Sequence, residues 1–231
     1  MVTGADKINI ILTEAEVKHA IQKTTQNPGI FQRDNLRTRH PNIQFDCMLR
    51  GYIGELAIQK WLQQFGIALE ATNVRPEGES MDIDFLYKGN NIELKTSLIP
   101  DRDANMDAAI KQEDIKVIKR SDRIEDLQGD IHLQIFFNQL SRQTDQWLTA
   151  QRIDVTSTDI DYLYGMFESN VLLSGTYLVA WIDKPTLILQ INALPHRDRT
   201  WTFSKSQRQF WKCRIQDNRR PGELVGYLRD L

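Results

Sequence analysis

The most regular apolar pattern in the chain predicts an amphipathic helix over residues 43–65. Apolar side chains recur there at steps of three and four residues, which places them along one face of a helix. Gly66 follows, a residue type at which helices commonly end. Glu55 lies at the border of the apolar stripe, so we expect its carboxylate near the core and not in open solvent.

Shorter patterns predict the remaining elements. Thr13 and Glu16 have the spacing of a capping box at the start of a helix. Apolar runs flanked by turn residues predict strands. We expect helices over residues 13–24, 114–128 and 156–167, and strands over 67–75, 131–137, 176–182 and 186–191, the last two joined by a turn at 183–185. This order of elements predicts a mixed α/β core.

The segment 82–97 predicts a β-hairpin that collects charged side chains on one face. Its two alternating runs surround Gly89-Asn90, which tolerate the positive φ of a type I′ turn. With that turn, Asp84 lies opposite Lys95. Side chains two positions apart point to the same side of a strand, so Glu93 joins them within reach of a cross-strand contact.

The two carboxylates on this face lie close enough to repel each other unless a proton or a cation intervenes. Mg²⁺ prefers oxygen ligands and takes one or two protein carboxylates, so Asp84 and Glu93 are candidate ligands, with Asp82 ranked after them. Such an ion polarises a phosphoryl oxygen and acidifies a bound water, while the ammonium of Lys95 stabilises developing charge. These parts suit phosphodiester hydrolysis. The alternative is a cross-strand ion pair on a solvated sheet face.

The hairpin resembles that of the PD-(D/E)XK nuclease superfamily. In "DIDF" and "IELKTS", Asp84 matches the family's acid on the first strand, and Glu93 and Lys95 match its acid-x-lysine on the second. Glu55 in "GYIGELAIQKWL" matches the metal-proximal acid that the family often carries on the preceding helix. Ile83 stands in place of the motif's proline, a departure that removes no functional group. The resemblance implies the catalytic residues Asp84, Glu93, Lys95 and Glu55, with the three acids as metal ligands.

The resemblance covers about residues 45–137 and implies an α/β fold. We expect a restriction-endonuclease-like core, with a central mixed β-sheet flanked by helices and a C-terminal α+β extension. The expected segments are an N-terminal helix with an Arg-rich loop (1–42), the PD-(D/E)XK catalytic core (43–140), and the remainder of the core with a basic, aromatic-rich DNA-binding extension (141–231). Together they form one compact domain.

Polar residues near the motif are candidates for accessory roles. Gln134 in "HLQIF" lies where a polar side chain often lines the family's site, although a glutamine satisfied within the core fits equally well. Asp82 and Ser97 are the other accessory candidates.

The charge distribution permits DNA binding at the ends of the chain. The net charge is −2, yet residues 196–231 hold nine Lys and Arg against four Asp and Glu, and residues 51–195 hold 13 against 22. Basic side chains bind phosphates, and guanidiniums also bind guanine edges, although such clusters equally occur on solvated faces. The candidate DNA-binding residues are Arg33, Arg37, Arg39, Lys205, Arg208, Lys212, Arg219 and Arg220.

The expected function is that of a Mg²⁺-dependent endodeoxyribonuclease, with Mn²⁺ as a substitute. A site-specific type II restriction endonuclease fits best: a homodimer acting on double-stranded DNA, with a cognate methyltransferase encoded nearby. The alternatives are a DNA-repair or junction-resolving nuclease of the same fold, a non-catalytic DNA-binding module, and a phosphohydrolase that acts without nucleic acid.

The cellular compartment is expected to be the cytoplasm. The chain has two cysteines without metal-site spacing, no secretory signal pattern and no apolar stretch of membrane-spanning length, so we also expect no membrane association.

Overall fold

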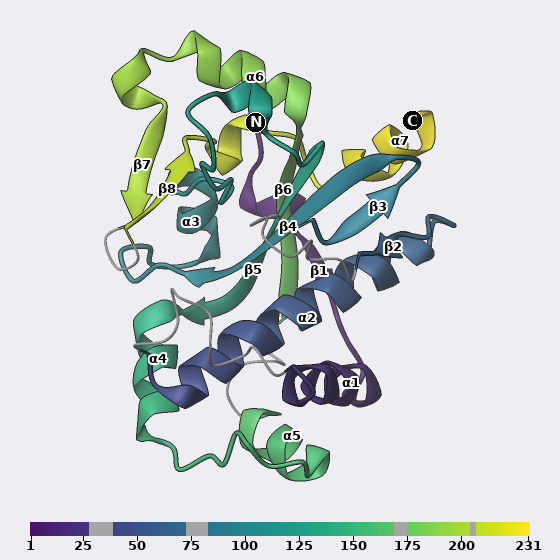
Figure 1. The fold of residues 1–231 in the computed structure, drawn as a ribbon, viewed down its shortest axis with the longest axis vertical. Coiled ribbons are helices and arrows are strands. Elements are labelled where there is room, and N and C mark those ends of the chain that lie inside the picture. Colours follow the sequence, from purple (N-terminus) through teal and green to yellow (C-terminus); the bar gives the residue numbers. More distant parts are fainter. Residues whose placement is uncertain (28–38, 73–82, 169–174, 204–206) are drawn as a thin grey trace.

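A six-stranded mixed sheet lies at the centre of the computed structural model, which describes residues 1–27, 39–72, 83–168, 175–203 and 207–231 (Figure 1). Its strands β4 and β5 run parallel, and the other neighbouring pairs are antiparallel. Across the sheet the order is β1 (Ile8–Ile10), β6 (Thr176–Asp183), β5 (Ile131–Leu140), β4 (Asn90–Ile99), β3 (Phe85–Tyr87) and β2 (Glu70–Ala71).

Helices pack on both faces of this sheet, and each face has its own apolar core. The first core contains side chains from α1 (Glu14–Thr25), α2 (Pro41–Gln63), α4 (Ser141–Ala150), α5 (Ile160–Glu168) and α7 (Glu223–Asp230). The second contains side chains from α3 (Met106–Gln112), η2 (Ile124–Asp126), α6 (Lys184–Ala193) and η4 (Ile215–Asp217). The chain also forms the short helices η1 (Gly4–Asp6) and η3 (His196–Asp198), and the hairpin of β7 (Thr200–Phe203) and β8 (Arg208–Trp211).

Helix α2 crosses β4 at close range because a glycine faces the strand. A Cβ atom at Gly54 would lie 2.4 Å from Cγ2 of Thr96 and 3.4 Å from Cδ2 of Leu94, so a larger residue would require the Thr96 side chain or the helix to shift. This contact fixes the neighbouring residue, Glu55, beside β4.

The predicted helices over 13–24 and 43–65 are confirmed as α1 and α2. The capping box is present, since the Thr13 hydroxyl accepts from the Glu16 N–H at 3.3 Å and the Glu16 carboxylate accepts from the Thr13 N–H at 2.6 Å. The predicted strands over 131–137 and 176–182 are confirmed as β5 and β6, and the helix over 156–167 as α5, which begins at Ile160.

The predicted strand over 186–191 is wrong, because this segment belongs to α6. Asp183 caps the helix, its carboxylate accepting from the Thr186 N–H at 2.9 Å. Pro185 sits in the first turn, where a missing N–H costs nothing. The residues that the pattern assigned to a turn therefore start a helix.

The predicted helix over 114–128 is also wrong. Ile115 and Val117 alternate into the second core, and their segment runs extended beside β8. The Ile115 N–H donates to the Cys213 carbonyl at 2.7 Å, and the Trp211 N–H donates to the Val117 carbonyl at 2.9 Å. Only η2 is helical in this stretch. Of the predicted strand 67–75, Glu70–Ala71 forms β2, and residues 73–75 lie outside the described part of the chain.

The fold is thus mixed α/β, with a mixed sheet flanked by helices. The predicted segments 1–42, 43–140 and 141–231 all contribute strands to the same sheet. Among the helices of the described residues, none combines the length and the apolar character that crossing a membrane requires.

Candidate active site

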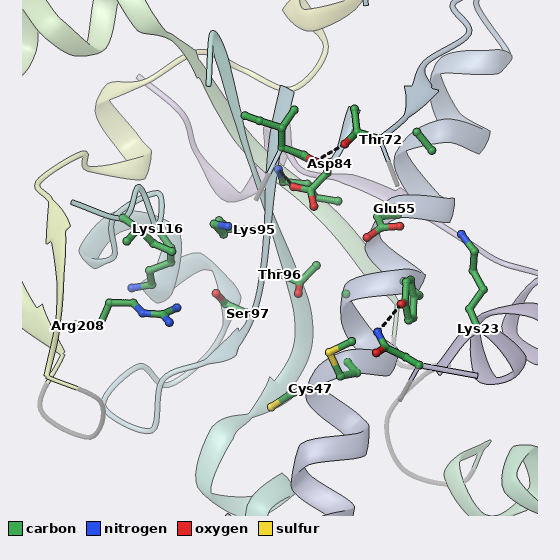
Figure 2. A pocket seen from close by; sticks show the side chains of 18 of the residues that line it. Lys23, Cys47, Glu55, Thr72, Asp84, Lys95, Thr96, Ser97, Lys116 and Arg208 are labelled. Atoms are coloured by element: carbon green, nitrogen blue, oxygen red, sulfur yellow. Dashed lines mark hydrogen bonds between the residues drawn. The ribbon is translucent and has the colours of Figure 1, made fainter. Parts of the chain in front are cut away.

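A cleft of about 770 Å³ lies between α2 and the β7–β8 hairpin, with β4 running through its centre (Figure 2). The cleft exists because β3 pairs only with residues 90–92 of β4, which continues to Ile99. The edge of β4 beyond this pairing is therefore not covered by β3. The charged residues that line the cleft are Lys23, Glu55, Asp84, Lys95, Lys116 and Arg208.

The hairpin turn differs from the predicted one by one residue. Lys88 and Gly89 occupy the turn with φ of 48° and 80°, and Tyr87 pairs with Asn90. The Asn90 side chain donates to the Lys88 carbonyl at 3.2 Å and so supports the turn. The predicted turn at Gly89-Asn90 is therefore wrong, and so is the pairing of Asp84 with Lys95 that followed from it.

Asp84 lies at an irregular end of the β3–β4 pair. Its N–H donates at 3.0 Å to the carbonyl of Ile92, the residue that Phe85 faces across the ladder. Two residues opposite one is the arrangement of a β-bulge, which changes the direction of a side chain. The Asp84 carboxylate accepts from the Leu94 N–H at 2.6 Å. It therefore lies at the edge of β4, where it lines the cleft.

Glu55 reaches the same cleft from α2, and Figure 2 shows its carboxylate on the side of β4 where Asp84 lies. Partial burial and the charge of Asp84 raise the pKa of Glu55 to about 7, while Lys23 opposes the shift. The structure thus brings together two carboxylates that destabilise each other as anions. The sequence prediction that Glu55 lies near the core is confirmed.

Glu93 and Lys95 share a face of β4, and their side chains form an ion pair of 2.8 Å. Glu93 is only 5% exposed, whereas Lys95 lines the cleft. A second contact joins Glu93 Oε2 to His132 Nδ1 on β5 at 2.9 Å. Burial alone would raise the pKa of Glu93, but the charge of Lys95 and the hydrogen bond from His132 outweigh it and the pKa is lowered.

The four predicted catalytic residues therefore fall into two groups. Asp84, Glu55 and Lys95 line the cleft, and Glu93 lies beneath Lys95 without lining it. Within the described residues, no three His, Cys, Asp or Glu side chains are placed so that they could hold a metal ion together. Asp82 lies outside the described residues.

Two accessory candidates have different surroundings. Ser97 lines the cleft. Gln134 is fully buried and satisfied: its amide donates to the Lys95 carbonyl at 3.1 Å, and its carbonyl oxygen accepts from the Lys116 N–H at 3.0 Å. Gln134 therefore joins β4 to the segment that carries Lys116, as the core alternative expects.

The basic candidates are spread over several surfaces. Arg208 lines the cleft, Arg39 Nη1 lies 3.9 Å from the Sγ of a cleft residue, Cys47, and Lys212 is exposed. Arg219 is held by an ion pair of 2.7 Å with a buried aspartate, and Arg220 Nε lies 3.5 Å from an aspartate of η1. The candidates Arg33, Arg37 and Lys205 lie outside the described residues.

The sequence analysis missed Lys23, Lys116 and His132. Lys116 lies in the segment that was wrongly assigned to a helix, and its ammonium stands 4.6 Å over the ring of Trp201, which stacks on Phe210. His132 had a visible signal, because the alternation in "HLQIF" places it on the same strand face as Gln134.

Searches against protein-family models, curated proteins and solved structures find no match to this chain. The candidate active site therefore rests on its geometry and on the sequence resemblance.

Proposed function

We propose that the chain is a metal-dependent endonuclease that hydrolyses phosphodiester bonds of DNA. The observation that carries the proposal is the convergence of three residues on one cleft: Glu55 from α2, Lys95 from β4, and Asp84 from the position before β3. Two acids and an amine lining one cleft are the parts that phosphodiester hydrolysis requires.

The donor set of the cleft fits Mg²⁺. Asp84 and Glu55 are hard oxygen donors, and Mg²⁺ usually takes one or two carboxylates from the protein. The raised pKa of Glu55 supports this reading, because a cation beside the pair would stabilise both groups as anions. When bound, the ion would polarise a phosphoryl oxygen and lower the pKa of a water.

Lys95 is the group that would contact the reacting phosphate. Its ammonium lies in the cleft and is held from behind by Glu93. An ammonium fixed in advance stabilises the negative charge that develops on phosphate oxygens in the transition state. Asp84 and Lys95 thus act from different directions, the first from the strand edge and the second from the face of β4.

The walls of the cleft favour a polyanionic substrate. Its basic lining residues, Lys23 on α1, Lys95, Lys116 and Arg208, outnumber its two acids. Such a lining attracts phosphates at several positions along a chain. A site-specific type II restriction endonuclease, acting as a homodimer on double-stranded DNA, is the role that we favour within this class.

Plasmid cleavage tests the proposal. Purified protein is incubated with supercoiled plasmid and Mg²⁺ or Mn²⁺, alongside Asp84→Asn, Lys95→Met and the control Lys111→Met on the exposed side of α3. Asp84→Asn keeps an oxygen that can accept from the Leu94 N–H, so the strand edge is preserved. We expect both site variants to lose about a hundredfold or more in rate and the control to retain activity.

The products distinguish the alternatives. Discrete fragments support a site-specific enzyme, and a smear supports a nonspecific nuclease. A mobility shift without cleavage would support a non-catalytic DNA-binding module. Full activity of the Asp84→Asn protein would contradict the proposed site.

A further inference from the structure

A buried chain of charged and polar contacts runs behind the cleft, from β5 to the ammonium of Lys95. Glu93 and His132 are direct neighbours in the parallel β4–β5 pair. Glu93 Oε2 lies 2.9 Å from His132 Nδ1, and Glu93 Oε1 lies 2.8 Å from Lys95 Nζ. One carboxylate therefore binds a ring on one strand with one oxygen and a cleft lysine with the other.

The far side of the His132 ring is fixed as well. Its Nε2 lies 3.1 Å from the carbonyl oxygen of Gly129, and the ring is only 2% exposed. A Cβ atom at Gly129 would lie 2.7 Å from Cε1 of the ring and 3.4 Å from Cβ of Glu93. The chain folds closely over both side chains only because residue 129 has no side chain.

This support matters because lysine is long and flexible. Its ammonium sits on a four-carbon stem with several rotatable bonds, so a precise position needs a partner that is itself immobile. Glu93 is such a partner only if its own carboxylate is held. His132 supplies the shorter contact, 2.9 Å to Oε2, and Arg120 Nη2 lies 3.9 Å from Oε1.

We propose that His132 is a positioning residue, which orients the Glu93 carboxylate and through it fixes the Lys95 ammonium in the cleft. The consequence for DNA cleavage rests on the proposed nuclease function, whereas the positioning of Lys95 does not. A residue that supports the contact of a functional group typically changes activity by about 10- to 100-fold when it is replaced.

The conservative variant His132→Asn separates positioning from packing. An asparagine amide can occupy the place of Nδ1 and donate to Glu93, whereas the amide of His132→Gln reaches further, toward the place of Nε2. His132→Leu fills the space without any donor. Gly129→Ala perturbs the ring from outside, and Gly165→Ala on α5, where an added Cβ meets nothing within 4 Å, is its matched control.

The first readout is the reactivity of Lys95, which needs neither metal nor DNA. Each folded variant is treated with an amine-selective acylating reagent, and labelling rates are measured by peptide mass spectrometry. Lys116 is the internal reference, since it lines the same cleft but pairs with Glu113 at 2.7 Å. We expect Lys95 labelling to rise several-fold relative to Lys116 in His132→Leu and Gly129→Ala, and to stay near wild type in His132→Asn and Gly165→Ala.

The second readout is plasmid cleavage with Mg²⁺. We expect His132→Leu to cut about 10- to 100-fold more slowly than wild type, with His132→Asn recovering most of the rate. If the wild-type protein does not cut DNA, the nuclease proposal fails while the labelling result still decides the role of His132.

Unchanged Lys95 labelling in a folded His132→Leu protein would overturn the inference, whatever the wild type cleaves. Should His132→Leu fail to fold, the comparison of His132→Asn with His132→Gln decides, because both keep a polar side chain. Equal Lys95 reactivity in those two proteins would then overturn it.

Discussion

The protonation of Glu55 gives a prediction about folding that does not depend on catalysis. Its pKa rises from the ordinary value of 4.5 to about 7. Below pH 4.5 the carboxyl is protonated in both the folded and the unfolded chain, and its contribution to stability is fully present. As the pH rises through the window from 4.5 to 7, the unfolded chain releases the proton more readily, so this contribution is lost.

The size of the loss follows from the shift. One pKa unit corresponds to about 1.4 kcal/mol, so the free energy of unfolding should fall by about 3 kcal/mol across that window because of Glu55 alone. Glu55→Gln replaces the carboxyl by a neutral group of the same shape and removes the titration. Relative to wild type, the variant should gain about 3 kcal/mol between pH 4 and pH 8.

Urea unfolding at pH 4 and pH 8 measures this double difference. Comparing the two pH values cancels any cost of the amide that does not depend on pH. Glu70→Gln, on the exposed strand β2, is the matched control, for which we expect no such gain. A stability difference between Glu55→Gln and wild type that is the same at both pH values would refute the electrostatic account of this residue.

The same urea-unfolding measurement also tests the proposed metal site. At pH 8, Mg²⁺ should stabilise the wild-type protein, because a ligand that binds only the folded state adds to its stability. Since the variant lacks one of the two carboxylates, its gain with Mg²⁺ should be smaller. Equal stabilisation of both proteins by Mg²⁺ would mean that the ion does not bind at Glu55.

Three further predictions concern the turn, the helix contact and the cleft wall. Lys88→Asn should raise the free energy of unfolding by about 1 kcal/mol in urea titrations, because asparagine adopts positive φ at a lower cost than lysine; a loss of stability would contradict the observed turn. Gly54→Ala should destabilise the protein by about 1–3 kcal/mol, seen as a lower melting temperature, and an unchanged melting temperature would mean that α2 does not press on β4. Arg208→Ala should reduce by about one the slope of log binding constant against log salt concentration for DNA, whereas Arg220→Ala should leave this slope unchanged. Both slopes are measured in Ca²⁺ by fluorescence anisotropy. A reduced slope for Arg220→Ala alone would mean that DNA binds at the surface of Arg220 and not in the cleft.

The elements that the sequence predicted correctly are those for which two local signals agree. In α2 the apolar spacing and the glycine after it agree, and in α1 both halves of the capping box are present. The prediction of a strand over residues 186–191 failed because a short β-branched apolar run fits a buried strand and a buried helix equally well. The decisive signal was the start, where Asp183 and Pro185 form a helix N-terminus instead of a turn.

The candidate site was predicted in its residues better than in its geometry. The family resemblance pointed to Asp84, Glu55 and Lys95, and all three line the cleft. The hairpin register could not be predicted, because it depends on Lys88 adopting positive φ, a conformation that propensity disfavours. The separate position of Glu93 could not be predicted either, since it depends on His132, which a different strand brings beside it.

The position of Asp84 has a consequence for how molecules of this protein meet one another. An unpaired strand edge offers hydrogen-bonding groups to any extended chain, and folded proteins guard such edges to avoid joining edge to edge. Among the described residues, β3 leaves the edge of β4 beyond Ile92 without a ladder partner. The Asp84 carboxylate occupies the Leu94 N–H, so the same side chain that serves the cleft also withholds a docking point. Removing the Asp84 carboxylate should therefore free the Leu94 N–H, and we expect a folded Asp84→Ala protein to self-associate more than the wild type.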